Sequence, residues 1–309
     1  AGVAAADVTF GGYGRFGVLY QENAAGTDET NVTSRFRLQI DATAESDMGV
    51  TFGARARIQQ NNTDENVSVT KGADGIFGTA DDGLTTAGPA GTGINGVRFF
   101  ARTGGFEVGV GNIYGALESM PGMYEIDLGL TGLSYEYTAY NFRGDAYSSG
   151  GNGAAGSNGV EALYSMGDLK VHISASDTND RVAGYVAYTF NGFTFAAAAQ
   201  DSNAAGDTDY ALSVVGNVGP AKVSLAYADN GDDTGVGTVN GDHYALTASF
   251  DIGAATNLDV YVADADYFAE TSYGIGAHHD LGGGVSLRGG IISKGDDTIR
   301  ADMGVRFTF

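Results

Sequence analysis

Two short segments of the chain carry closely spaced arginines, Arg35 with Arg37 and Arg55 with Arg57, although the formal net charge is −22. Side chains two residues apart on a strand share one face. Each arginine pair therefore points to one side of its strand, and apolar residues such as Phe36 point to the other. We expect the two segments to form a hairpin in which Arg37 lies opposite Arg55 and Arg35 lies opposite Arg57.

The arginines of this hairpin would repel one another unless water surrounds them. Like charges directly opposed on neighbouring strands destabilise the pair. A dry core does not accept four guanidinium groups without partners. The arginine face must therefore contact water, and its presence in so acidic a chain indicates a functional surface.

A second candidate site is the glycine-rich segment KGADGIFGTADDGLTT, which contains Asp74, Asp81 and Asp82. Closely spaced carboxylates in a glycine-rich turn can wrap calcium, which takes six to eight oxygen ligands. The spacing does not match an EF-hand, and acidic glycine-rich segments are commonly hydrated loops. Both interpretations of this segment stay open.

Catalytic motifs are not evident. The four histidines are His172, His243, His278 and His279, and neither GxSxG nor HExxH surrounds them. The sequence therefore predicts no enzymatic activity. A calcium-dependent surface adhesin is an alternative that suits the acidic and glycine content, but such proteins need tandem nonapeptide repeats, and we find none.

The composition limits the class of protein. The chain has 50 glycines, 17 tyrosines, 16 phenylalanines, 3 prolines and no cysteine, which argues against a helical protein and a disulfide scaffold. The pI of about 4.2 argues against a nucleic-acid partner. We expect residues 1–309 to form a single domain. Residues 1–6 resemble the end of a secretory signal, with Ala4–Ala6 as a small-residue cleavage site.

Alternation of apolar and polar residues recurs along the chain, for example Leu169, Val171 and Ile173 against Lys170 and His172. It predicts about 16 strands of roughly 8 to 13 residues, an even number of the length that spans a bilayer at a tilt. Short turns such as NG and GGG alternate with longer polar connections such as residues 61–93 and 112–158. This sorting is typical of an outer-membrane, up-and-down, antiparallel β-barrel with short periplasmic turns and long external loops.

Several segments carry a resemblance to a known family. They are GYGRFGVLY, SRFRLQI, GFEVGVGNIYGALE, HDLGGGVSLRGGI and the terminal MGVRFTF. Together with the strand pattern, they resemble the general porins of Gram-negative outer membranes, and most of all the porins of photosynthetic purple bacteria. The resemblance covers nearly the whole chain. It implies that the terminal Phe309 is an assembly signal for the barrel-assembly machinery.

The resemblance also implies a role for residues 113–158, the third loop, which folds into the lumen of such porins and constricts the pore. Acidic groups of this loop would face basic groups on the barrel wall. The acidic candidates are Glu118, Glu125, Asp127, Glu136 and Asp145. The basic candidates, which strand alternation points inward from the first four strands, form what we call the arginine wall: Arg15, Arg35, Arg37, Arg55, Arg57, Arg98 and Arg102.

The predicted function is passive diffusion of small hydrophilic solutes and ions through a water-filled channel. The transverse field between arginine wall and acidic loop would orient and filter solutes. The acidic total charge predicts a weak preference for cations. The family resemblance implies a homotrimer in contact with outer-membrane lipid and lipopolysaccharide, and calcium near the loop acids, with no cofactor required. A substrate-specific channel remains the alternative, although no aromatic ladder is evident along an inner strand face.

Overall fold

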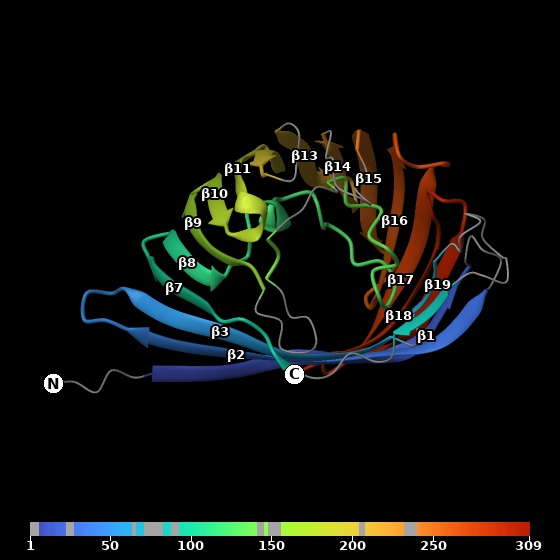
Figure 1. The fold of residues 1–309 in the computed structure, drawn as a ribbon, viewed down its shortest axis with the longest axis horizontal. Coiled ribbons are helices and arrows are strands. Elements are labelled where there is room, and N and C mark those ends of the chain that lie inside the picture. Colours follow the sequence, from blue (N-terminus) through green and yellow to red (C-terminus); the bar gives the residue numbers. More distant parts are fainter. Residues whose placement is uncertain are drawn as a thin grey trace.

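Sixteen antiparallel strands form one closed barrel in the computed structural model (Figure 1). The structure describes residues 6–22, 28–63, 66–70, 83–87, 93–140, 145–147, 156–203, 208–231 and 240–309. Strands that follow one another in the barrel pair side by side. The first strand also pairs with the last, from Tyr13 opposite Thr308 to Gln21 opposite Arg300, which closes the sheet. The predicted all-β up-and-down barrel is confirmed.

The strands vary from short segments to long, twisted ribbons. They are β1 (Ala6–Gln21), β2 (Glu29–Glu45), β3 (Thr51–Thr63), β6 (Gly93–Ile94), β7 (Arg98–Thr103), β8 (Phe106–Asn112), β9 (Asn158–Met166), β10 (Leu169–Ser176), β11 (Val182–Phe190), β12 (Phe193–Asp201), β13 (Asp209–Val218), β14 (Ala221–Asp229), β15 (Asp242–Asp251), β16 (Thr256–Ala265), β17 (Ser272–Gly282), β18 (Val285–Ser293) and β19 (Ile299–Thr308). Both β6 and β7 pair with β3, so they form a single interrupted strand of the barrel.

A few elements lie outside the barrel sheet. Strands β4 (Asn66–Thr70) and β5 (Gly83–Ala87) pair only with each other. Two 3-10 turns, η1 (Leu117–Ser119) and η2 (Thr178–Asp180), follow β8 and β10. Among the described residues, no helix is long and apolar enough to cross a membrane.

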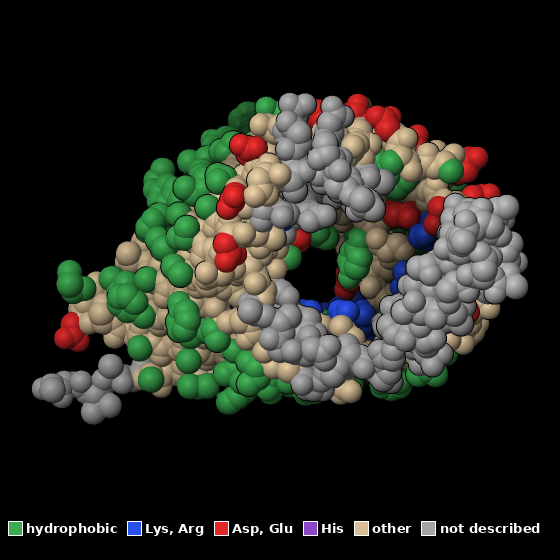
Figure 2. All heavy atoms as spheres, viewed as in Figure 1, with side chains coloured by type: hydrophobic (Ala, Val, Ile, Leu, Met, Phe, Trp, Pro, Cys, Tyr) green, Lys and Arg blue, Asp and Glu red, His purple; other side chains and the backbone are tan. Residues whose placement is uncertain are grey.

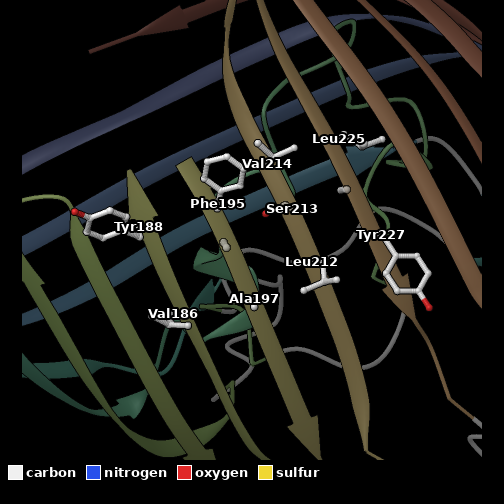
Figure 3. Close-up of a pocket in the computed structure, with 11 residues that line it drawn as sticks. Val186, Tyr188, Phe195, Ala197, Leu212, Ser213, Val214, Leu225 and Tyr227 are labelled. Carbon is white, nitrogen blue, oxygen red and sulfur yellow. The ribbon is translucent and has the colours of Figure 1, made fainter. Parts of the chain in front are cut away.

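Hydrophobic side chains gather on the outside of the barrel, as seen on the left flank of the molecule in Figure 2. Figure 3 shows part of it, a shallow groove lined by outward-pointing side chains of β11 to β14. Val186, Phe195 and Leu212 are each about half exposed, at 48%, 52% and 52%. Large apolar side chains would not stay exposed to water in such numbers, so this surface fits contact with lipid tails.

Tight turns close the hairpins at the end of the barrel where the chain terminates. Between β11 and β12, Asn191 and Gly192 take left-handed backbone angles, with φ of 50° and 81°. Two successive positive φ values suit the twist of the flanking strands, and Asn–Gly adopts them at little cost. The long third loop connects strands at the opposite end, so the predicted sorting of short turns and long connections is present.

The hairpin of β2 and β3 has a register that differs from the predicted one. A turn from Ser46 to Val50 leaves Glu45 opposite Thr51; in it the Ser46 N–H donates to the Val50 carbonyl and the Val50 N–H donates to Ser46 Oγ. Arginines of the two strands therefore oppose polar residues: Arg35 opposes Asn61, Arg37 opposes Gln59, Arg57 opposes Gln39, and Arg55 opposes Asp41. The predicted Arg–Arg pairs across this hairpin are wrong, because the turn sets the register. The shift is even, so every side chain keeps its predicted face.

The apolar core of the molecule lies inside the barrel, between the third loop and one side of the wall. In Figure 1, the segment that follows β8 runs within the ring of strands. Its Leu117, Met123, Leu128 and Leu133 are at most 1% exposed. They belong to one cluster with the inner face of β11 to β16, where small side chains leave room for the loop. One row across these strands reads Ala187, Ala196, Ser213, Ala226, Ala245 and Ala263.

We expect Ala211→Leu, on the inner face of β13, to destabilise the protein by about 1–3 kcal/mol, because a larger side chain overpacks a tight core. Ala211 is 0% exposed and belongs to the cluster that the loop completes. Thermal unfolding in detergent measures the effect. The outward-facing Ala197→Leu is the control and should leave the melting temperature unchanged. Equal stability of the two variants would show that the loop does not pack on this wall.

Candidate functional site

Three arginines of β2 and β3 are fixed by neutral amide side chains across the strand pair. In each case the arginine Nε–H donates to the side-chain carbonyl oxygen of the residue directly opposite. The distances are 2.5 Å for Arg35 to Asn61, 2.5 Å for Arg37 to Gln59 and 3.0 Å for Arg57 to Gln39. An amide orients a guanidinium group but does not neutralise it. We call Arg35, Arg37 and Arg57 the amide-paired arginines, and each keeps its full positive charge.

The fourth arginine of this hairpin has a charged partner. Arg55 Nε lies 2.6 Å from Asp41 Oδ1, and its NH1 group donates to the hydroxyl of Tyr114 at 2.6 Å. Both charged side chains are partly exposed, at 26% and 20%. The pair is therefore neutral overall, so it adds little to the positive potential of the amide-paired arginines.

Tyr13 on β1 holds several arginines together. Its ring lies between two guanidinium groups, with Arg306 at 4.4 Å and Arg37 at 5.2 Å from the ring centroid. Its hydroxyl accepts a hydrogen bond from Arg35 NH1 at 3.2 Å. The negative face of an aromatic ring attracts cations without cancelling their charge. Tyr13 thus lets the arginines crowd together while the wall remains positive.

Arg15 connects the wall to the third loop. It lies opposite Arg35 on one side and Arg306 on the other, so one row of three arginines crosses β19, β1 and β2. Its NH1 group donates to the backbone carbonyl of Leu130 at 2.7 Å. Asp302 on β19 fixes the same part of the loop, because its carboxylate accepts from the backbone N–H groups of Leu130 and Thr131 at 2.8 and 2.7 Å.

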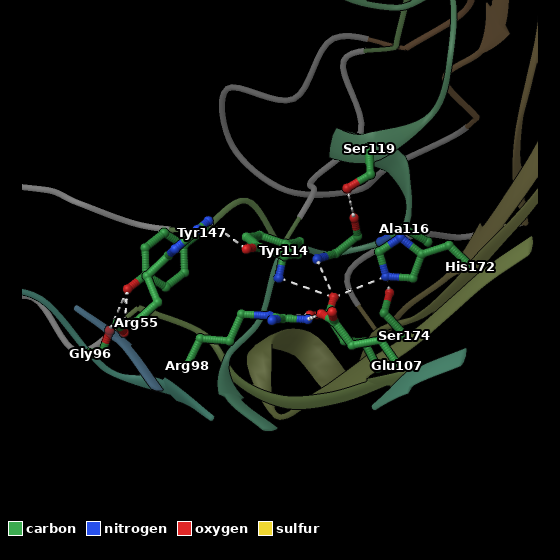
Figure 4. A network of polar contacts seen from close by, with 12 residues as sticks. Arg55, Gly96, Arg98, Glu107, Tyr114, Ala116, Ser119, Tyr147, His172 and Ser174 are labelled. Carbon is green, nitrogen blue, oxygen red and sulfur yellow. Dashed lines mark hydrogen bonds and ion pairs between the residues drawn. The ribbon is translucent and has the colours of Figure 1, made fainter. Parts of the chain in front are cut away.

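Arg98 belongs to a buried network that fixes the start of the third loop (Figure 4). Its Nε donates to Glu161 Oε1 and its NH2 to Glu107 Oε1, both at 2.6 Å. The other oxygen of Glu161 accepts from the backbone N–H groups of Tyr114 and Gly115, both at 3.1 Å, and lies 2.9 Å from His172 Nε2. Side chains of Glu161 and His172 are 0% exposed. We call these contacts the Glu161 network.

Arg102 lies apart from the arginines of β1 to β3. It stands opposite Thr51 beside the turn that joins β7 to β8, at the short-turn end of the barrel. Its side chain is exposed, and its guanidinium group is 5.4 Å from the ring centroid of Phe100. The structure therefore gathers five of the seven predicted arginines on β1 to β3, buries Arg98 in ion pairs and leaves Arg102 near the mouth.

One predicted loop acid crosses the lumen to basic groups of the wall. Asp127 Oδ2 accepts from Arg288 NH1 at 2.6 Å and from Arg306 NH1 at 2.7 Å. Its side chain is 45% exposed, so this contact faces water. The arginines that Asp127 meets lie on β18 and β19, beyond the first four strands where we expected them.

The other four acids make their contacts elsewhere. Glu125 forms an ion pair with Lys222 on β14, and Asp145 forms one with the buried Arg181. Glu136 accepts from the Ser272 hydroxyl at 2.6 Å and from the Gly295 N–H at 3.0 Å. Burial raises the pKa of the Glu118 carboxyl, although hydrogen bonds from Tyr140 and Tyr124 oppose the shift. None of these four has an ion pair with the arginine wall in the described part of the chain.

Several residues of this site were not predicted from the sequence. They are Tyr13, Gln39, Asp41, Gln59, Asn61, Glu161, Arg288 and Arg306. Strand alternation points all of them inward, so the signal was present. The partners of each arginine depend on register, which alternation does not determine.

The remaining predictions fall at the edges of the structure. Asp74, Asp81 and Asp82 of the calcium prediction lie outside the described residues, as do residues 1–5 of the signal-like segment. Phe309 is 53% exposed, and its ring stacks on Phe36 with centroids 5.8 Å apart. His172 and His243 point into the barrel and are buried, as strand alternation predicts.

Comparisons with known proteins identify the family of this chain. Residues 1–297 match the Gram-negative porin family. A curated porin of Fuscovulum blasticum is 32% identical over 98% of this chain and 100% of its own length. Two solved mutants of the Rhodopseudomonas blastica porin, one triple and one double, have TM-scores of 0.79 and 0.78 and identities of 27% and 26%, over 98% of this chain and 100% of theirs. The chain belongs to the Gram-negative porin family and forms a channel in the outer membrane.

Proposed function

We propose that ions and small hydrophilic solutes diffuse through this channel at a constriction between the third loop and the arginines of β1 to β3, β18 and β19. The observation that carries the proposal is the path of residues 113–140 inside the barrel, joined to the wall through Leu130 and Asp127. In the view of Figure 2, an opening passes through the molecule, and Lys and Arg side chains line one side of it.

The constriction separates positive and negative charge. Among the described residues the amide-paired arginines have no ion pair, whereas the loop carries carboxylates such as Asp127, which is shared between Arg288 and Arg306, and Glu125, which pairs with Lys222. A solute that passes between them experiences a transverse field, which favours polar molecules that can align their dipoles. The total charge of −22 attracts cations to the mouths. A weak preference for cations is the expected balance, because the arginines oppose it at the narrowest point.

Planar-bilayer recording tests the diffusion function. We expect stable steps whose conductance rises in proportion to salt concentration and does not saturate, as diffusion through a wet pore requires. Proteoliposomes containing the protein should swell in small neutral solutes at rates that fall with solute size. The absence of conductance from a folded, detergent-soluble sample would contradict the proposal.

The assembly and ion partners remain proposals from the family resemblance. They are a homotrimer, lipopolysaccharide around the barrel, recognition of Phe309 by the barrel-assembly machinery, and calcium near the loop acids. Calcium at Asp74, Asp81 and Asp82 is proposed from the spacing of these carboxylates in a glycine-rich segment. Exposure of Val8, Phe10 and Phe16, at 51%, 65% and 54%, supports an apolar contact along β1. Cross-linking followed by mass measurement tests the trimer.

A further inference from the structure

A separate cavity of about 290 Å³ lies between the third loop and the wall, on the long-loop side of the barrel. Loop residues from Tyr124 to Tyr140 form one side of it. His243 at the start of β15, with Tyr267 and Phe268 after β16, forms the other side. Neither the arginine wall nor the Glu161 network contributes to this cavity.

Aromatic rings dominate the lining. Tyr124 packs against Tyr135 and Tyr140 with centroids 6.4 and 6.1 Å apart, and His243 packs against Phe268 at 5.2 Å. Tyr124 and Tyr135 are nevertheless each 42% exposed. Within the lumen, this exposed ring surface faces water, which is unfavourable unless a ligand covers it.

The backbone holds one of these rings in place at a conformational cost. Leu133, Ser134 and Tyr135 have φ of 42°, 79° and 57°, three successive left-handed residues that are not glycine. Such residues cost about 1–3 kcal/mol each and cluster where geometry serves a function. The turn folds the Tyr135 ring onto Gly132, where a Cβ atom would lie 2.1 Å from Tyr135 Cζ. The strained turn therefore fixes the position of the Tyr135 ring at the edge of the cavity.

The charged groups beside the cavity already have hydrogen-bond partners in the protein. Glu136 Oε2 accepts from the Ser272 hydroxyl and from the Gly295 N–H, and Arg300 NH1 donates to Ser134 Oγ at 3.2 Å. His243 Nε2 lies 3.0 Å from the Glu136 carbonyl oxygen, which can only accept, so Nε2 carries a proton. Its Nδ1 is then free to accept from the Tyr267 hydroxyl at 2.7 Å, which suits a neutral imidazole.

We propose that this cavity, which we call the tyrosine cavity, binds the ring of a neutral monosaccharide before it enters the constriction. One face of a pyranose presents C–H groups, which pack on the negative face of an aromatic ring. Its rim presents hydroxyl groups, and the Ser134 and Tyr135 hydroxyls lie at the cavity edge to meet them. The volume is at the small end of ligand pockets, which suits one sugar ring.

The proposal rests on the proposed diffusion function, because the cavity opens to the same lumen. Binding must be weak, since a solute that is held tightly does not cross. A weak binding site in the same lumen raises the local sugar concentration and favours sugars over open-chain polyols of similar size. The rings come from the loop and from a turn, which explains why the strand faces show no aromatic ladder.

Current recordings with D-glucose as the probe test the tyrosine cavity. We expect glucose, added on the long-loop side, to increase the current noise of the open channel several-fold more than the acyclic polyol mannitol at equal concentration. Tyr135→Leu should abolish this difference, because Leu fills space without a ring. Tyr135→Phe should retain it at least half, since the ring remains.

The outcomes separate the two proposals. A channel without ion conductance would contradict the diffusion function itself. Two results with normal ion conductance would overturn the sugar site alone. One is equal current noise with glucose and with mannitol; the other is glucose noise that stays unchanged in both Tyr135→Leu and Tyr124→Leu. Block by tetramethylammonium without an effect of glucose would also overturn it and indicate a cation site. Circular dichroism and thermal unfolding of each variant in detergent show whether it has folded.

Discussion

Replacement of Arg35, Arg37 and Arg57 by glutamine is expected to convert weak cation preference into strong cation selectivity. Each of these arginines has an amide partner, so each substitution removes a whole positive charge from the lumen. A unit charge about 4 Å from an ion in water changes the free energy of that ion by about 1 kcal/mol, or about fivefold in occupancy. We expect the triple variant to raise the cation-to-anion permeability ratio at least fivefold, as measured by the reversal potential across a potassium chloride gradient.

Arg102→Gln is the matched control for this experiment. It removes the same charge from the lumen, but near the wide short-turn end, where ions pass at a greater distance and salt screens the charge. Its reversal potential should differ little from that of the parent protein. If the control shifts selectivity as much as one amide-paired arginine does, the total charge of the lumen decides selectivity and the arginines of β2 and β3 have no special position.

Glu161→Gln is expected to free the start of the third loop. An amide has a single acceptor oxygen, so its NH2 group must face either Arg98 Nε or the N–H groups of Tyr114 and Gly115. Each lost hydrogen bond to a buried charge contributes about 1.5–3 kcal/mol. We expect a lower melting temperature in detergent and, in single-channel records, frequent transitions between conductance levels in place of one steady level.

Glu107→Gln separates loop fixation from simple loss of charge. Glu107 also accepts a hydrogen bond from Arg98 NH2 at 2.6 Å, but it has no hydrogen bond to the described residues of the third loop, and its side chain is 21% exposed. This variant should show steady conductance with a smaller loss of stability. Conductance that is equally unsteady in both variants would mean that neutralising Arg98, rather than holding Tyr114 and Gly115, is what matters.

Much of the fold followed from the sequence because a membrane barrel repeats one simple rule. Alternation with period two fixed which side chains face lipid, and the outward Phe36 and inward Arg35 illustrate it. Turn chemistry such as Asn191–Gly192 marked the short-turn end. The register could not be predicted in this way. With the Ser46–Val50 turn, β3 pairs with β2 four residues away from the predicted register, so every arginine has a different partner from the predicted one.

Alternation predicted which charged side chains face the lumen, but it did not predict how they pair. The inward direction of the arginines follows from strand alternation alone. The positions of the loop acids follow from the path of the loop, which has no sequence periodicity. Asp127 reaches Arg288 and Arg306, while Glu136 and Asp145 serve as anchors. The sequence does contain one indication of where the third loop lies. The alanines on the inner face of β11 to β16 mark the part of the wall that the loop covers.

Labelling of a single cysteine tests the location of the constriction most directly, because the chain contains no cysteine of its own. In Arg37→Cys channels, a negatively charged thiol reagent is added while the conductance of one open channel is recorded. Reaction at residue 37 should lower the conductance by at least half, whereas the same reaction in Arg102→Cys channels should change it little. A channel that reacts at residue 37, as mass spectrometry would show, yet conducts as before would contradict a constriction at the amide-paired arginines.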